Sequence, residues 1–152
     1  YNFNVIADKV TLKGTTRAYS ENNRLLIKKR MKEILDGIAL SYGATILLDY
    51  EDGYPPVINN SECADKLITS ANKIVGNGVS KPYLTMGGED FSYFLQKVPG
   101  CFFFIGSAPQ NREPLSVPHH CSHFDINEDS LLIGASTFVQ LIEDLLMKGN
   151  DK

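Results

Sequence analysis

Hydrophobic and polar side chains alternate along residues 9–19 of the chain. The positions pointing one way are Val10, Leu12, Gly14, Thr16 and Ala18, and those pointing the other way are Thr11, Lys13, Thr15, Arg17 and Tyr19. This period of two predicts a β-strand with one apolar face. Residues 44–50 return to an extended, aliphatic pattern and predict another strand.

Between these two segments the spacing changes to that of an amphipathic helix, over residues 22–41. Its apolar positions are Ile27, Met31, Ile34, Leu35 and Ile38. Gly43 follows as a helix stop. We expect residues 1–54 to form an antiparallel sheet whose apolar face is covered by this helix.

The run Gly53-Tyr54-Pro55-Pro56 marks a module boundary, because proline cannot donate to a strand ladder. A helix follows, with Asn60 as its N-cap and with Gly76 and Gly78 ending it. A second helix closes the chain, and its apolar positions are Leu131, Ala135, Phe138, Leu141, Ile142 and Leu145.

Residues 101–105 are continuously apolar and lie between Pro99-Gly100 and Gly106. Such a run predicts a strand that is buried on both faces. The polar connection over residues 107–118 is long, and connections of that length are often functional.

Composition narrows the class of protein. With 152 residues, 43% of them hydrophobic and 22% charged, the chain is typical of a globular protein. Its net charge of −3 comes from interspersed acidic and basic residues, which argues against nucleic-acid binding. Three scattered cysteines favour a reducing, cytoplasmic location over a disulfide framework. No apolar run approaches the roughly 20 residues of a membrane helix, although a chain that begins with Tyr1 need not show its true N-terminus.

The stretch from His119 to Asp125 gathers side chains that bind metals: three histidines, a cysteine and an aspartate. The neutral imidazole of histidine is the commonest metal ligand among protein side chains. Adjacent residues cannot occupy four tetrahedral positions around one ion, so at most one or two of them would bind. The alternative is a surface loop whose histidines are incidental.

Two further segments are candidate anion sites. Paired glycines in Met86-Gly87-Gly88-Glu89-Asp90-Phe91 leave backbone amides available ahead of a short helix, which favours a carboxylate ligand. The alternative is a turn in which Glu89 or Asp90 caps that helix. Arg17 can hold a carboxylate with two hydrogen bonds, or can belong to a solvated sheet face.

In their order along the chain, these pieces resemble a known enzyme family. The matching stretches are Asn4-Val5-Ile6-Ala7-Asp8, Gly14-Thr15-Thr16-Arg17, Tyr42-Gly43-Ala44, Gly53 to Pro56, Met86 to Phe91, Val98-Pro99-Gly100 and His120 to Asp125 with Ile133-Gly134-Ala135. The chain resembles the amidohydrolases of the aminoacylase and carboxypeptidase-G type, in the branch of hippurate hydrolase and indole-acetyl-amino-acid hydrolase.

This resemblance implies an α/β (α+β) fold in two parts. Residues 1–54 would be part of a lid domain that mediates dimerisation, and residues 55–152 the C-terminal part of a zinc-peptidase-like catalytic domain. The chain would then be about half of an enzyme, inactive alone, that forms a homodimer and acts on a small N-acyl amino acid, with neither nucleic acid nor membrane as a partner.

The resemblance also assigns roles to individual residues. His120 matches a histidine that completes a site for two divalent ions, zinc or manganese, whereas His119 and His123 inherit no ligand role. Asn4 and Arg17 match lid residues that reach a substrate carboxylate. Gly88 and Glu89 fall in a loop that lines the substrate pocket.

The family's other metal ligands and its general-base glutamate belong to the first half of a full-length member, so no catalytic residue is expected in this chain. In the family, two metal ions polarise the amide carbonyl and lower the pKa of a water, and the glutamate transfers the proton. The alternative from another class of function is a non-catalytic dimerisation or carboxylate-binding module.

Overall fold

A computed structural model describes residues 3–111, 113 and 119–147 of the chain. These residues divide into two compact units, each described separately below. Unit 1 comprises residues 1–56 and 86–88, and unit 2 comprises residues 57–85 and 89–152. The assignment of residues 1–54 to a lid and of residues 55–152 to a catalytic domain stays a prediction.

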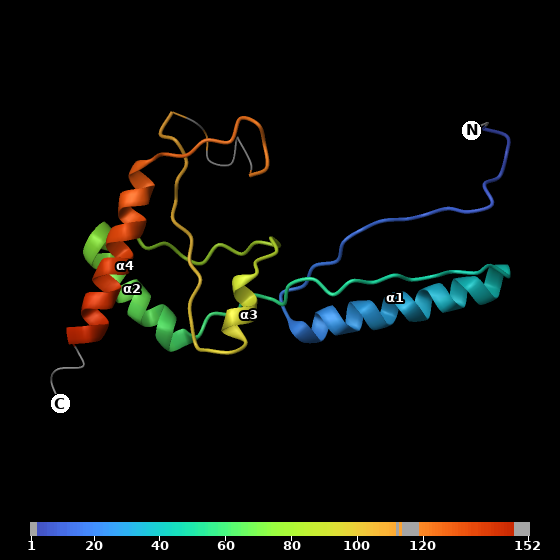
Figure 1. Ribbon diagram of the computed structural model, residues 1–152, viewed down its shortest axis with the longest axis horizontal. Coiled ribbons are helices and arrows are strands. Elements are labelled where there is room, and N and C mark those ends of the chain that lie inside the picture. Colours follow the sequence, from blue (N-terminus) through green and yellow to red (C-terminus); the bar gives the residue numbers. More distant parts are fainter. Residues whose placement is uncertain (1–2, 112, 114–118, 148–152) are drawn as a thin grey trace. The chain divides into compact units, whose positions relative to one another are not determined.

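Unit 1 is built on helix α1, Glu21–Tyr42 (Figure 1). Ser20 caps its start, because the Ser20 side chain accepts a hydrogen bond from the Asn23 amide at 3.2 Å. Gly43 ends it in the left-handed conformation, with φ of 62°. The sequence prediction of this helix is confirmed, with bounds within one residue of those expected.

Residues 44–52 run back beside α1 (Figure 1), and polar contacts connect the two segments. The Lys28 ammonium donates to Asp52 at 2.5 Å and lies 5.2 Å from the centre of the Tyr50 ring. Arg24 donates to the Gly53 carbonyl at 3.3 Å. No residue of α1 is buried: Ile27, Met31 and Leu35 are half-buried, and Ile34 and Ile38 are exposed.

Unit 2 contains the remaining helices: α2 (Ser61–Val75), η1 (Gly76–Gly78), α3 (Phe91–Leu95) and α4 (Asp129–Met147). Asn60 caps α2 by accepting a hydrogen bond from the Cys63 amide at 3.0 Å, as its sequence position predicted. Gly76 ends α2 with φ of 61°. Helices α2 and α4 pack against each other (Figure 1).

A polar cluster joins α2 to α4. The Ser70 hydroxyl, which is 1% exposed, donates to the Asp144 carboxylate at 2.6 Å. Lys73 and Gln140 donate to the other oxygen of Asp144. The Lys73 hydrogen bond, followed by that of Ser70, lowers the pKa of Asp144 below its ordinary value.

Small residues form the buried side of α4. They are Ser130, Gly134 and Thr137. A Cβ atom added to Gly134 would lie 2.7 Å from Cδ1 of Ile105, so the helix backbone approaches residues 101–105 closely. The apolar stripe that the sequence singled out is instead largely exposed, including Leu131, Phe138, Ile142 and Leu145. The predicted helix is therefore confirmed, and its buried side consists of small residues rather than of those apolar positions.

By length and composition, α4 also meets the criterion for a membrane-spanning helix, with 19 residues and a mean hydropathy of 1.4. Core helices of soluble proteins meet the same criterion. An ion pair between Lys73 and Asp144 joins this helix to α2.

The predicted α/β (α+β) fold with an antiparallel sheet is wrong for the described residues, which contain four α-helices and a 3-10 turn but no β-strand. Residues 9–19 and 44–50 meet through a side-chain hydrogen bond between Thr16 and Tyr50, 2.6 Å long, and no backbone ladder joins them. Alternation shows that a segment suits a sheet, but a strand also needs hydrogen bonds to a neighbouring segment.

Residues 101–105 likewise form no strand, but their side chains contact different groups in alternation. Phe103 and Ile105 contact α4: the Phe103 ring lies 5.4 Å from that of Phe138, and Ile105 lies against Gly134. Phe102 and Phe104 belong to an aromatic cluster with Phe91 and Tyr83. Much of the polar loop that follows, residues 112 and 114–118, lies outside the described residues.

Candidate functional site

The histidine segment ends in a tight turn directly before α4. The Phe124 amide donates to the Cys121 carbonyl at 3.0 Å, and the His123 amide donates to Cys121 Sγ at 3.5 Å. The His119 ring lies 4.9 Å from the Phe124 ring. These contacts shape the backbone directly after His120, and the His120 side chain is exposed.

His120 has φ of 65°, and it is the one non-glycine residue with positive φ in the part of the chain that the structure describes. The left-handed region is costly for a residue with a side chain. Such conformations persist where the surrounding contacts impose them, and they concentrate at functional sites. The sequence motif and the backbone geometry thus distinguish the same histidine.

Asn127 anchors this turn to the rest of unit 2. Its amide donates to the Ser107 carbonyl at 2.8 Å, and its side-chain oxygen accepts from the Asp129 amide at 3.0 Å. Asp125 accepts a hydrogen bond from the Ile126 amide at 2.9 Å. The start of α4 and the end of the 101–105 segment are therefore held together, which gives His120 a fixed support.

The described residues do not by themselves assemble a metal site. Over residues 3–111, 113 and 119–147, no group of three or more His, Cys, Asp or Glu side chains could hold an ion. The donor chemistry of His120 suits a single ligand position, as an exposed imidazole on a fixed turn.

Glu89 lies directly before Asp90, the N-cap residue of α3, which makes no side-chain capping hydrogen bond. The Glu89 carboxylate accepts from the Phe91 amide at 3.3 Å, and the Glu89 carbonyl accepts from the fully buried Ser92 hydroxyl at 2.6 Å. The role of Glu89 in lining a substrate pocket stays a prediction.

Gly88 lies against the Tyr54 ring. A Cβ atom at this position would be 3.1 Å from Tyr54 Cδ2, which is closer than most real Cβ contacts. The absence of a side chain at Gly88 therefore lets the two segments of unit 1 approach closely.

Arg17 and Asn4 are both exposed residues of unit 1. Arg17 donates to Thr15 Oγ1 at 2.7 Å. No hydrogen bond in the described part of the chain joins any two of Asn4, Arg17, Gly88, Glu89 and His120. The substrate-binding roles of Asn4, Arg17, Gly88 and Glu89 and the ligand role of His120 therefore stay predictions.

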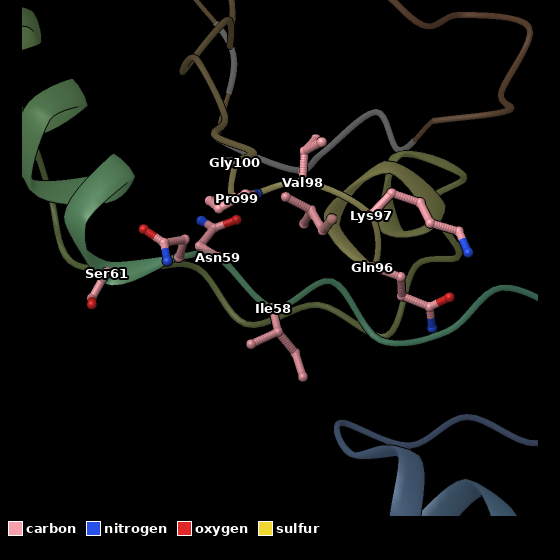
Figure 2. Close-up of a pocket in the computed structure, with 10 residues that line it drawn as sticks. Ile58, Asn59, Ser61, Gln96, Lys97, Val98, Pro99 and Gly100 are labelled. Atoms are coloured by element: carbon pink, nitrogen blue, oxygen red, sulfur yellow. The ribbon is translucent and has the colours of Figure 1, made fainter.

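Asn59 was missed by sequence reasoning. Its side-chain amide donates to the Phe102 carbonyl and its side-chain oxygen accepts from the Phe102 amide, both at 2.8 Å. Asn59 thereby gives Phe102 the hydrogen bonds that a neighbouring strand would give. Asn59 borders an open hollow lined by residues 58–61 and 95–100. Figure 2 shows Asn59 beside Pro99 and Gly100, whereas the Lys97 side chain projects away from them. The sequence signal that could have drawn attention to Asn59 is its position directly before Asn60, the predicted helix cap.

Comparison with known proteins identifies the family. The model of peptidase family M20/M25/M40 matches residues 4–144. The Bacillus subtilis protein YhaA, described as an amidohydrolase, is 42% identical over 134 residues, which cover 88% of this chain and 34% of YhaA. The IAA-amino acid hydrolase ILR1-like 4 of Arabidopsis thaliana is 32% identical over 96% of this chain and 34% of its own length.

Two further comparisons agree. N-acetyldiaminopimelate deacetylase of Streptococcus suis is 44% identical over 68% of this chain and 28% of its own length. A crystal structure from methicillin-resistant Staphylococcus aureus, described as an aminohydrolase, superposes with a TM-score of 0.71 at 30% identity, over 82% of this chain and 32% of that one. The chain spans about a third of the length of the curated relatives it matches.

These matches confirm the resemblance that the motifs indicated. The family model covers both units of the chain, from Asn4 in unit 1 to Asp144 in unit 2. The chain belongs to peptidase family M20/M25/M40.

Proposed function

We propose that this chain is part of a metal-dependent hydrolase that cleaves the amide bond of N-acyl amino acids. The observation that carries the proposal is the family match over residues 4–144. The proposal assigns the family's histidine ligand to His120, whose backbone is left-handed. Relatives named for the hydrolysis of IAA-amino acids and for the deacetylation of N-acetyldiaminopimelate support this class of substrate.

In this proposal His120 contributes one ligand to a site for two divalent ions, zinc or manganese. When bound, such ions polarise an amide carbonyl and lower the pKa of a water. The other ligands and the general base would come from the part of the family that this chain does not span. No catalytic step is therefore assigned to the described residues beyond the fixed presentation of the His120 imidazole.

The remaining assigned residues would hold the substrate. Arg17 and Asn4 carry exposed polar side chains suited to a carboxylate, and the Arg17 guanidinium can bind it through two hydrogen bonds. Gly88 and Glu89 would line the pocket. The cytoplasmic location and the homodimer also belong to this proposal.

The proposal is tested with an extended protein, in which the segment of YhaA that precedes the matched region is joined ahead of Tyr1. We expect it to release glycine from hippurate, to lose that activity on chelation and to regain it when zinc or manganese is added. A folded extended protein that binds N-acyl amino acids without hydrolysing any of them would favour the non-catalytic binding module instead.

A further inference from the structure

Two cysteines that are distant in sequence lie on facing segments of unit 2. Within residues 101–105, Phe103 and Ile105 project toward α4. Cys101 lies two residues before Phe103 and so shares its side of the segment. Cys63 occupies the first turn of α2, the helix that packs on α4.

Hydrogen bonds hold the backbone near both cysteines. The Asn60 amide donates to the Gly100 carbonyl at 2.9 Å, and Asn59 binds both backbone groups of Phe102 at 2.8 Å. The residues on either side of Cys101 are thus fixed to the two residues that directly precede α2. Cys63 follows three positions later, and its amide donates to Asn60 Oδ1 at 3.0 Å.

Both thiols are free and half-buried. Burial raises the pKa of the Cys101 thiol, and the nearby Cys63 sulfur raises it further. Electrostatic interaction between the two sulfurs agrees with the backbone contacts, which bring their segments together.

We propose that Cys63 and Cys101 form a reversible disulfide that responds to the thiol–disulfide balance of the surroundings. The oxidant is a low-molecular-weight disulfide such as oxidised glutathione. The Cys63 thiolate attacks one of its sulfurs and expels one glutathione thiolate, leaving a mixed disulfide on Cys63. The Cys101 thiol then loses its proton to solvent and attacks Cys63 Sγ, which expels the second glutathione. The two cysteines are oxidised, and one glutathione disulfide is reduced to two thiols.

The bond would join the first turn of α2 to the segment that carries Phe102 and Phe103. It would also close a covalent loop that contains α3 together with Gly88 and Glu89. A cross-link of this kind restricts the unfolded chain and so favours the folded state of unit 2. Oxidation would therefore make the loop between Cys63 and Cys101 more rigid. This loop includes Gly88 and Glu89, which the proposed function assigns to substrate binding.

The test is to incubate the chain with increasing ratios of oxidised to reduced glutathione, to block free thiols, and to map peptides by mass spectrometry without reduction. We expect a Cys63–Cys101 cross-link within one chain, independent of protein concentration, and circular dichroism unchanged from that of the reduced chain. Glutathione retained on both cysteines, free thiols throughout, or a cross-link through Cys121 would overturn the proposal. This experiment needs no substitution, so it stays decisive even if a variant misfolds.

Variants test the order of the two steps. In Cys101→Ser, the glutathione adduct on Cys63 should accumulate and should disappear at least about tenfold more slowly than in the wild type. Cys121→Ser, the matched control, should form the cross-link at the wild-type rate. Equal lifetimes of the Cys63 adduct in the wild type and in Cys101→Ser would show that Cys101 does not resolve it.

Discussion

Helices α1 and α4 are stabilised in different ways. Helix α1 has well-formed caps and a surface lined with ion pairs, yet none of its residues is buried. Helix α4 has a buried side of small residues and is joined to α2 through Ser70 and Asp144. Helix formation therefore depends on local signals, whereas packing depends on small and polar residues that a hydrophobic pattern does not reveal.

The largest expected difference between the helices comes from adding a side chain at a glycine. Gly134→Leu places a large group against Ile105, and should destabilise unit 2 by about 1–3 kcal/mol. Gly37→Leu is the matched control, because no atom lies within 4 Å of a Cβ at Gly37 and leucine favours a helix. Thermal unfolding measures the change in stability of each variant, and hydrogen exchange of peptides from α1 and α4 shows which helix loses protection. Equal effects at the two positions would contradict the close packing of α4.

Loss of the buried hydroxyl between α2 and α4 should have the next largest effect. Ser70→Ala removes the hydrogen bond to Asp144 and should cost about 1–2 kcal/mol of unfolding free energy. Because the pKa of Asp144 is lowered in the folded state, its carboxylate stabilises the fold above about pH 4 and ceases to do so as the pH falls further. The difference between wild type and Ser70→Ala should therefore be greatest near neutral pH and shrink in acid. A difference that grows in acid would reverse the assigned role of Asp144.

A smaller effect is expected at Asn59. Asn59→Ala removes two hydrogen bonds to the partly exposed backbone of Phe102 and should cost about 1 kcal/mol. Faster hydrogen exchange at Phe102 than in the wild type, with exchange in α1 unchanged, is the expected signature. Asn72→Ala, within α2, provides a matched control. If Asn59→Ala leaves Phe102 exchange unaltered, the side chain does not fix that segment.

The smallest effect is expected for the surface ion pair of unit 1. Lys28 holds the pKa of Asp52 below its ordinary value, but both side chains are well exposed. Asp52→Asn should leave hydrogen exchange of α1 unchanged above about 0.15 M salt, because solvent and salt screen such pairs. A large loss of α1 protection at that salt concentration would show that this pair does more than a surface ion pair.

Sequence reasoning succeeded where the signal is local. Gly43 and Asn60 define helix ends through contacts within a few residues, and both appear as helix caps in the structure. The strands failed because pairing depends on a distant neighbour, which the alternation in residues 9–19 does not report. The pairing of Asn59 with Phe102 is also long-range, so no single segment predicted it.

The candidate site shows the same contrast between local features, which the sequence indicates, and long-range contacts, which it does not. The position of His120 followed from a continuous motif, and its left-handed backbone was added by the structure. Its partners would be residues distant from it, and the described residues form no group of three metal-binding side chains. The substrate-binding roles of Arg17, Asn4, Gly88 and Glu89 stay predictions for the same reason.

Hydrolysis of hippurate by the extended protein, measured for His120→Ala and His123→Ala side by side, tests the central claim most directly. The two histidines share one turn, but of the two only His120 has the left-handed backbone, and only His120 is proposed as a metal ligand. We expect His120→Ala to lower kcat/KM at least about 100-fold and to lower bound metal. His123→Ala should stay within about threefold of the wild type. Full activity and metal content in a folded His120→Ala protein would contradict the assignment of His120 as a metal ligand.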